Sequence, residues 1–591
     1  MTTSTSSGPV PAARGAQAAQ LRTRQYPAAR ALALARQSVS PLLARILAGR
    51  GIASLEEVSG ALKHLHHHSQ LKGTAEAAVF LADRIAHNRR FLVVADYDCD
   101  GATACAVALR GLRALGGRVD YIVPDRMVHG YGLTPSVVAL AHERFPDADV
   151  LITVDNGVAS HAGVDAARAL GLEVLVTDHH LPSRDKPLPA ANVIVDPSQP
   201  GCPFPSKALA GVGVIWYVLW ALQDELRRRG LGSPSFKVRS LLSLVAVGTV
   251  ADVVPLDRNN RILVQAGLER IRAGQTFPGI TALATAGVIN RTDPKELLTS
   301  HIAFGIGPRI NAAGRLETMD IGISCLTTDD EARAVALANQ LDDINQERKE
   351  IENATVIEAV EQADALVIDG TRSIAVHSDA WHAGVIGIVA GRIKERRYRP
   401  TFVLTTDAAT GQIKGSGRSI PGFNLKDALD QVDKACPGLM PKFGGHAMAA
   451  GVTLRPGGFE AFRDAFEAQA QLVLTDELLC QRVDVDGSLT GHELSPEVAR
   501  SLAGPPWGQM FPEPAFCDEF EILEAKLTGP YKDQLNLVVL REGVTLKATR
   551  FRHEGPLPGT HATLVYKLNL TRNKFGKDEL KLLVDSLWAG Q

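Results

Sequence analysis

The sequence has few cysteines and no arrangement of them that would support a disulfide framework. Its 591 residues include 7 cysteines, which are scattered and nowhere spaced as Cys-x-x-Cys. This pattern excludes a disulfide-stapled secreted domain and a zinc ribbon, and it favours a reducing compartment. We therefore expect a bacterial cytoplasmic protein.

Long apolar runs are also missing. The longest uncharged apolar stretch, from Ala208 to Gln223, is shorter than the roughly 18 to 20 residues that a membrane-spanning helix needs. We expect a buried core helix there and no membrane partner. Because hydrophobic residues make up 45% of the chain and charged residues 22%, disordered and collagen-like classes are excluded.

Acidic residues are absent from the N-terminal segment. None precedes Glu56, although seven arginines do. An Arg-rich, acid-poor start is typical of a mitochondrial transit peptide, but we favour a flexible bacterial extension over residues 1–40.

A histidine-rich stretch follows, His64-Leu65-His66-His67-His68. Metal sites of this kind usually combine histidine with carboxylates. Because no carboxylate neighbours this stretch in the sequence, we interpret it as an exposed helix end.

The chain also lacks a net charge of either sign that would predict a polyanionic partner. Its formal net charge is -2, so any nucleic-acid surface must be local. Residues 526–577 contain ten basic residues against three acidic ones, with aromatic residues interleaved. This composition is typical of a single-strand-binding OB-fold, and equally of a solvated β face whose aromatic residues belong to the core.

From residue 90 onward, short apolar runs alternate with helix-length segments, which predicts a parallel α/β sheet. Four runs, 91–95, 150–154, 173–177 and 193–195, are each followed directly by an aspartate. The carboxyl ends of parallel strands meet at one edge, where ligands bind. We therefore expect these carboxylates to gather there.

The first of these aspartates opens the segment Asp96-Tyr97-Asp98-Cys99-Asp100-Gly101. Three alternating acids repel one another unless cations neutralise them. An EF-hand loop begins in the same way, but its twelfth position must be Glu, and here it is Val107. Calcium binding by that route is therefore excluded.

Further oxygen and imidazole ligands are available from Asp155, His179, His180 and Asp252. A donor set without thiolate suits Mn²⁺ or Mg²⁺, with zinc as the second choice. Such a set is large enough for two ions, the arrangement that clamps a phosphoryl group during in-line hydrolysis.

The remaining chain indicates further domains. Residues 329–365 predict one long polar helix of the kind that joins two domains. A second α/β unit with glycine-rich loops follows, and beyond it short alternating runs predict a small β-barrel. We expect an extension at 1–40, a first domain at 41–328, the connecting helix at 329–365, and further domains at 366–475 and 476–591.

Several motifs together resemble the DHH phosphoesterase superfamily and its associated DHHA1 domain. The motifs are Asp96 to Gly101, Val154-Asp155-Asn156-Gly157, Thr177-Asp178-His179-His180, Gly248 to Leu256 and Gly444 to Gly451. Residues 304–315, 381–392 and the β-rich C-terminal region are similar to the branch of this superfamily that contains single-stranded-DNA exonucleases. The resemblance implies an α/β chain with a parallel-sheet DHH domain, a long helix, a smaller α/β DHHA1 domain and a C-terminal β-barrel of the OB-fold type.

The resemblance also implies roles for individual residues. Asp155 would bridge two ions, His180 would contact the scissile phosphate, and Asp178 would orient the histidines. The implied metal ligands are Asp96, Asp98, Asp100, Asp155, His179 and Asp252, and the implied catalytic residues are Asp98, Asp100, Asp155, His179 and His180. The residues implied to hold the 5′-phosphate and DNA are Arg126, Arg309, Ser416, Arg418 and His446.

One departure concerns the first motif. In the pyrophosphatase branch of the superfamily a histidine stands four residues before the second motif aspartate, where this chain has Val94. The departure favours the nuclease branch and leaves the relative roles of Asp96 and Asp100 open.

The activity implied is a metal-dependent exonuclease that degrades single-stranded DNA 5′ to 3′ to mononucleotides in repair and recombination. Single-stranded DNA would be its substrate, and a single-strand-binding protein and a helicase its partners. Two alternatives stay open: a DHH phosphodiesterase acting on cyclic dinucleotides or short oligonucleotides, and a non-catalytic single-strand-binding protein.

Overall fold

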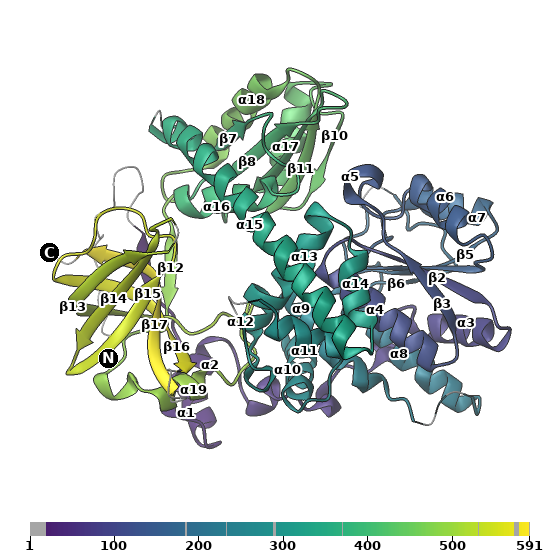
Figure 1. Ribbon diagram of the computed structural model, residues 1–591, viewed down its shortest axis with the longest axis horizontal. Coiled ribbons are helices and arrows are strands. Elements are labelled where there is room, and N and C mark those ends of the chain that lie inside the picture. Colours follow the sequence, from purple (N-terminus) through teal and green to yellow (C-terminus); the bar gives the residue numbers. More distant parts are fainter. Residues whose placement is uncertain are drawn as a thin grey trace. The chain divides into compact units, whose positions relative to one another are not determined.

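The computed structural model describes residues 19–183, 186–231, 233, 235–287, 291–368, 370–529, 531–572 and 578–589 (Figure 1). The chain divides into two compact units. The parallel-sheet unit comprises residues 27–346 and 503–513, and the barrel unit comprises the chain up to Tyr26, residues 347–502 and the chain from Pro514.

The parallel-sheet unit is built on five parallel strands in the order β3-β2-β4-β5-β6. They are β2 (Arg90–Ala95), β3 (Arg118–Ile122), β4 (Val150–Val154), β5 (Glu173–Thr177) and β6 (Val193–Val195). The four strands expected from the sequence are confirmed, and β3 is additional. Because β3 and β4 lie on opposite sides of β2, the strand order reverses between β2 and β4, where ligands bind in sheets of this type.

Helices cover both faces of this sheet. On one face, α6 (Pro135–Arg144) and α7 (His161–Ala169) bury Val94, Leu151 and Val174. The helices of the other face are α3 (Thr74–Ala86), α4 (Cys99–Ala114) and α8 (Gly211–Arg228). Helix α8 is the buried core helix expected from the apolar stretch. Among the described residues, no helix combines the length and apolarity needed to cross a bilayer.

Further helices complete the parallel-sheet unit. They are α1 (Ala28–Ala35), α2 (Pro41–Gly49), α5 (Arg126–His129), α9 (Leu242–Ala251), α10 (Arg258–Arg272), α11 (Pro278–Thr285), α12 (Thr299–His301), α13 (Gly307–Leu316) and α14 (Asp320–Thr327).

The segment expected to be a flexible extension, residues 1–40, is folded over much of its described part. It contains α1 and strand β1 (Gln20–Thr23), which pairs in parallel with β12 (Arg482–Val485). Arg22 binds Asp484 at 2.6 Å, 462 residues further along the chain. Local composition could not indicate such a distant partner, and residues 1–18 lie outside the described residues.

The long polar helix expected over residues 329–365 is observed as α15 (Glu331–Ile368), and the boundary between the two units falls within it. The barrel unit then contains a mixed sheet in the order β10-β11-β9-β8-β7, in which only β7 and β8 are parallel. Its elements are β7 (Ile374–His377), α16 (Ile386–Arg397), β8 (Thr401–Thr406), β9 (Ile413–Arg418), α17 (Leu425–Ala435), β10 (Lys442–Gly445), β11 (Ala449–Leu454) and α18 (Phe459–Val473).

The C-terminal strands form a closed barrel in the order β13-β14-β15-β17-β16, as expected from their short alternating runs. Its elements are α19 (Pro496–Leu502), β13 (Phe516–Thr528), β14 (Gln534–Arg541), β15 (Val544–Arg550), β16 (His561–Arg572) and β17 (Asp578–Ala589). Because the barrel is closed, each of its five strands pairs with two neighbours.

Candidate metal centre

The turn from β2 into α4 fixes three carboxylates in different environments. Asp96 ends the strand and is buried. Asp98 is the N-cap of α4 and accepts a hydrogen bond from the Gly101 amide at 3.0 Å. A Cβ at Gly101 would lie 2.5 Å from the carbonyl oxygen of Asp96, so only glycine allows the turn to close this tightly.

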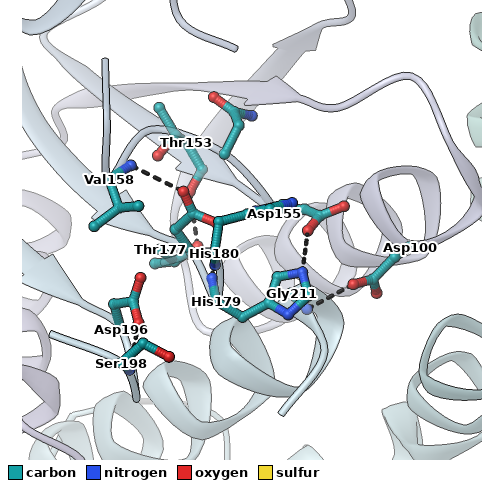
Figure 2. A network of polar contacts seen from close by, with 12 residues as sticks. Asp100, Thr153, Asp155, Val158, Thr177, His179, His180, Asp196, Ser198 and Gly211 are labelled. Carbon is teal, nitrogen blue, oxygen red and sulfur yellow. Dashed lines mark hydrogen bonds and ion pairs between the residues drawn. The ribbon is translucent and has the colours of Figure 1, made fainter. Parts of the chain in front are cut away.

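Asp100 is fully buried, and its carboxylate is held by the N-terminus of α8 (Figure 2). It accepts hydrogen bonds from the backbone amides of Gly211 at 2.6 Å and Val212 at 3.0 Å. Because a helix N-terminus carries partial positive charge, it stabilises a carboxylate there. Sequence reasoning missed these contacts, since α8 lies far along the chain. By contrast, Oδ1 of Asp96 is buried and accepts no hydrogen bond within the described part of the chain.

Asp155, His179 and Asp252 converge from three different elements. Asp155 follows β4 with a left-handed φ of 63°. Its Oδ1 lies 3.1 Å from Nε2 of His179, which points toward it in Figure 2, and the same Nε2 lies 3.6 Å from Oδ2 of Asp252. A Cβ at Gly211 would lie 2.6 Å from Oδ1 of Asp155, so α8 can pass this closely only because it begins with glycine.

His180 is oriented by Asp178. Oδ1 of Asp178 lies 2.7 Å from Nδ1 of His180, and its Oδ2 accepts from the Val158 amide at 2.8 Å. Burial lowers the pKa of His180, but the hydrogen bond to Asp178 and its charge outweigh burial and raise that pKa to about 9. Burial acts in the opposite direction on Asp178 and raises the pKa of its carboxyl group. The hydrogen bond from His180 and the charges of both histidines outweigh burial, and they hold that pKa below its usual value.

Tyr131 is a residue that sequence reasoning missed. Its Oη lies 3.0 Å from Nε2 of His180, and its ring meets the ring of Tyr97 edge-on. Tyr131 comes from the segment between α5 and α6, which carried no chemical motif, so only the fold could reveal this contact.

Asp196, which follows β6, is the fourth carboxylate at a strand end. Burial and then the charge of Asp178 raise its pKa to about 8, and its Oδ1 accepts from the Ser198 amide. It belongs to none of the groups of potential metal ligands among the described residues.

The cluster as a whole is strongly anionic and buried. Burial, followed by repulsion from neighbouring carboxylates, raises the pKa values of Asp96, Asp100 and Asp155 well above the usual range. Burial and then the charge of Asp98 raise the pKa of Asp252 to about 7. Ionising all of these groups together requires neutralising cations.

The donor atoms fit divalent cations. Buried oxygens of Asp96, Asp155 and Asp252 accept no hydrogen bond within the described part of the chain. Three groups have potential ligand atoms within 4.8 Å of one another: Asp96, Asp98 and Asp155; Asp155, His179 and His180; and Asp100, His179 and Asp252. Oxygen donors with imidazole and without thiolate suit Mn²⁺ and Mg²⁺. Asp155 and His179 each belong to two of these groups, and of the two only the carboxylate has two oxygens with which to bridge a pair of ions.

Arg309, expected to hold a phosphate, is held by protein contacts. It is 2% exposed, its Nε donates to Asp342 at 2.8 Å, and a terminal nitrogen donates to the Ala286 carbonyl at 3.0 Å. These contacts fix the guanidinium on α13, and the expected phosphate contact stays a prediction. Arg126 begins α5, and its side chain lies outside those described.

Ser416 and Arg418 lie two residues apart on β9 and therefore on the same face of the sheet. Arg418 donates to Oγ of Ser416 at 3.1 Å. A Cβ at Gly387 of α16 would approach both side chains to about 3 Å, so this glycine leaves room for the pair. His446 follows β10 and is exposed. These three residues belong to the barrel unit, whereas Arg309 belongs to the parallel-sheet unit.

Comparison with known proteins identifies three domains. Residues 90–249 match the DHH family, N-terminal domain; residues 370–472 match the DHHA1 domain; and residues 485–586 match the RecJ OB domain.

The chain is also similar to other proteins over nearly its whole length. The chain is 44% identical over 567 residues to the single-stranded-DNA-specific exonuclease RecJ of Escherichia coli (strain K12), covering 93% of this chain and 96% of that protein. It is similar to the solved structure of RecJ from Thermus thermophilus in complex with Mn²⁺, with a TM-score of 0.78, 30% identity and coverage of 97% and 79%. The Mg²⁺ complex of that protein gives a TM-score of 0.73, 29% identity and coverage of 97% and 78%.

Proposed function

The chain belongs to the RecJ family of single-stranded-DNA-specific exonucleases, and we propose that it removes mononucleotides from single-stranded DNA in the 5′ to 3′ direction. It is a metal-dependent hydrolase that uses Mn²⁺ or Mg²⁺, the ions bound in the related structures. The degradation of single strands would serve DNA repair and recombination.

One observation carries the proposal. Carboxylates that follow β2 and β4 meet His179 and Asp252 at the point where the strand order reverses, and buried oxygens among them accept no hydrogen bond from the described residues. We assign Asp96, Asp98, Asp100, Asp155, His179 and Asp252 to the metal site. Two divalent ions held there would supply an activated hydroxide and would stabilise the leaving oxygen in phosphodiester hydrolysis.

The residues around this cluster support distinct roles. Asp155 belongs to two ligand groups and, unlike His179, which also belongs to two, it has two carboxylate oxygens; this supports its assignment as the bridge between two ions. Asp178 fixes the ring of His180 through Nδ1. Nε2 lies 3.0 Å from Oη of Tyr131, and a substrate phosphate would take the place of this contact. Asp178 also accepts from the backbone amide of His179 at 2.7 Å, so it orients the loop that carries both histidines.

For the 5′-phosphate we propose Arg126, Arg309, Ser416, Arg418 and His446 as candidates. The pairing of Ser416 with Arg418 supports this assignment, because a hydroxyl beside a guanidinium can donate to one phosphate together with it. Arg309 is buried and held in place by Asp342 at 2.8 Å.

The test compares Asp155→Ala with Asp165→Ala, which alters an exposed aspartate on α7 of the same unit. Both full-length variants are incubated with end-labelled single-stranded and double-stranded DNA in Mn²⁺, Mg²⁺ or EDTA. We expect the Asp165 variant to release mononucleotides from single strands only, with either metal and not with EDTA, and the Asp155 variant to release none.

Retained hydrolysis by the Asp155 variant would contradict the assignment of the metal bridge. Hydrolysis limited to cyclic dinucleotides or very short oligonucleotides would contradict the proposed substrate. Loss from the 3′ end would contradict the proposed direction.

The partners and the location extend the proposal further. We propose that a single-strand-binding protein and a helicase act with this enzyme, and that it works in the bacterial cytoplasm. We also retain the domain limits 41–328, 366–475 and 476–591. Pull-down of the full chain with each purified partner tests the first point, and limited proteolysis followed by mass spectrometry tests the limits.

A further inference from the structure

A second group of potential metal ligands lies in the parallel-sheet unit and shares no residue with the metal centre. It joins the histidine-rich stretch to α8, where His67, His68 and Asp224 each offer one ligand atom, all within 4.8 Å of one another. The sequence did not suggest a metal site here because no carboxylate neighbours the histidines. The fold brings Asp224 to them from 156 residues further along the chain.

His68 and Asp224 form the inner part of this group. Nε2 of His68 lies 3.2 Å from Oδ2 of Asp224, and the His68 side chain is only 13% exposed. Nδ1 of His68 is buried and has no hydrogen-bond partner among the described residues. Oδ1 of Asp224 accepts from Arg227 at 2.9 Å, but Arg227 is 62% exposed, and exposed ion pairs of this kind hold a carboxylate only weakly.

His67 completes the group from the N-cap position of the short helix η3 (His68–Gln70). Its Nδ1 lies 2.9 Å from Oγ of Ser69. Histidines that bind metals through Nε2 usually donate the other ring N–H to an oxygen, which fixes the orientation of the ring. In the metal-free chain Nδ1 accepts from the Ser69 amide at 3.3 Å. With a metal on Nε2, Nδ1 would carry the proton and donate to Oγ of Ser69, which would then fix the ring.

Trp220 supports both imidazoles. It lies one helical turn before Asp224 on α8, and its ring meets those of His67 and His68 edge-on, with centroids 5.2 Å away in each case. This packing restricts the two histidines before any metal binds. It also places an indole close enough to report on an ion held by them.

We propose that His67, His68 and Asp224 form a site for a divalent transition metal of the Zn²⁺ or Ni²⁺ type, which ties the segment around η3 to α8. Two imidazoles with one carboxylate favour these ions over Mg²⁺. Three protein ligands leave a fourth tetrahedral position for water. The site is independent of the nuclease reaction, so the proposed function can fail without affecting it.

The experiment measures Zn²⁺ binding by calorimetry and Ni²⁺ binding by quenching of tryptophan fluorescence. The full-length chain carries Asp155→Ala, so that binding at the metal centre is weakened in every sample. On this background we compare His67→Ala and Asp224→Asn with the matched control His64→Ala. His64 belongs to the same histidine-rich stretch, but its Nε2 lies 3.7 Å from Oε2 of Glu56 and it is not part of the proposed site.

We expect His67→Ala and Asp224→Asn to weaken Zn²⁺ binding at least about tenfold and to reduce Ni²⁺ quenching, whereas His64→Ala should change neither. Zn²⁺ should also raise the melting temperature of the His64 variant and not of the other two. Since His67 is exposed, its replacement leaves the fold intact. Equal Zn²⁺ affinity in all three variants, or an equal loss in the His64 variant, would overturn the proposal.

In the chain with Asp155 intact, His67→Ala should leave the Mn²⁺-dependent nuclease rate unchanged. A loss of that rate would show that the two sites are not independent, and would overturn that part of the proposal.

Discussion

Replacing Asp252 by asparagine should stabilise the metal-free protein while it removes a proposed metal ligand. Burial and then the charge of Asp98 raise the pKa of Asp252 from 3.8 to about 7 in the folded chain, and its side chain is 20% exposed. Between these two values the folded state holds a proton that the unfolded state has released. The stability that the protonated Asp252 contributes to the fold is therefore fully present below pH 3.8. It is lost as the pH rises and is gone above about pH 7.

The size of the effect follows from the shift. A gap of about 3 pKa units corresponds to about 4 kcal/mol of unfolding free energy once Asp252 must ionise in the fold. Asparagine carries no charge and avoids this cost. We expect Asp252→Asn to raise the unfolding free energy of the metal-free protein by up to about 4 kcal/mol at pH 8 and by about 2 kcal/mol at pH 5.

Chemical unfolding in EDTA at both pH values measures the difference, with the exposed Asp165→Asn as the control. With Mn²⁺ added, the wild-type chain should gain more stability than the Asp252 variant, because it retains the ligand. A variant no more stable than the wild type at pH 8, or equally stabilised at both pH values, would refute the reasoning that the buried carboxylates destabilise the metal-free fold.

Three further predictions concern the same unit. Gly211→Ala would place a methyl group 2.6 Å from Oδ1 of Asp155, so nuclease activity and Mn²⁺ affinity, measured by titration, should fall far more than the melting temperature does. Arg309→Met leaves Asp342 buried without its partner and removes a proposed phosphate ligand, so we expect a loss of about 3 to 5 kcal/mol in unfolding free energy and a raised KM for single-stranded DNA; an unchanged KM would contradict the phosphate assignment. Mn²⁺ should raise the melting temperature of the metal-free protein more at pH 8 than at pH 6, because ligands must be deprotonated to bind, and thermal scans with and without EDTA check this.

Strands that bury both faces were predictable from the sequence, because their apolar runs are continuous and each ends at an aspartate. The edge strand β3 was not, since Arg118 and Asp120 interrupt its apolar pattern and face partly toward solvent. Strand β1 was not predictable either. It forms only because β12 pairs with it, and no local pattern carries that information.

Local and distant contacts differ in the same way at the candidate metal centre. The proximity of Asp96, Asp98 and Asp100 could be predicted, because these residues lie within one turn. The backbone amides of α8 that hold Asp100 could not be predicted, since they come from more than a hundred residues away. Asp224 could not be predicted as a neighbour of His67 and His68 either. No carboxylate stands near these histidines in the sequence, and the fold supplies one.

Charge was misleading for a related reason. Basic residues outnumber acidic ones within the segment 526–577. Several of these basic side chains nevertheless form ion pairs with acidic residues outside the segment. Lys547 binds Glu579 at 2.9 Å and Arg541 binds Asp518 at 2.8 Å, and these carboxylates lie on β17 and β13. A closed barrel places strands side by side that are distant in sequence, so a window along the chain overstates the free positive charge. Exposed cations such as Lys532, which follows the exposed Tyr531 directly in the sequence, are better placed for a DNA backbone, because charge and stacking can act together there.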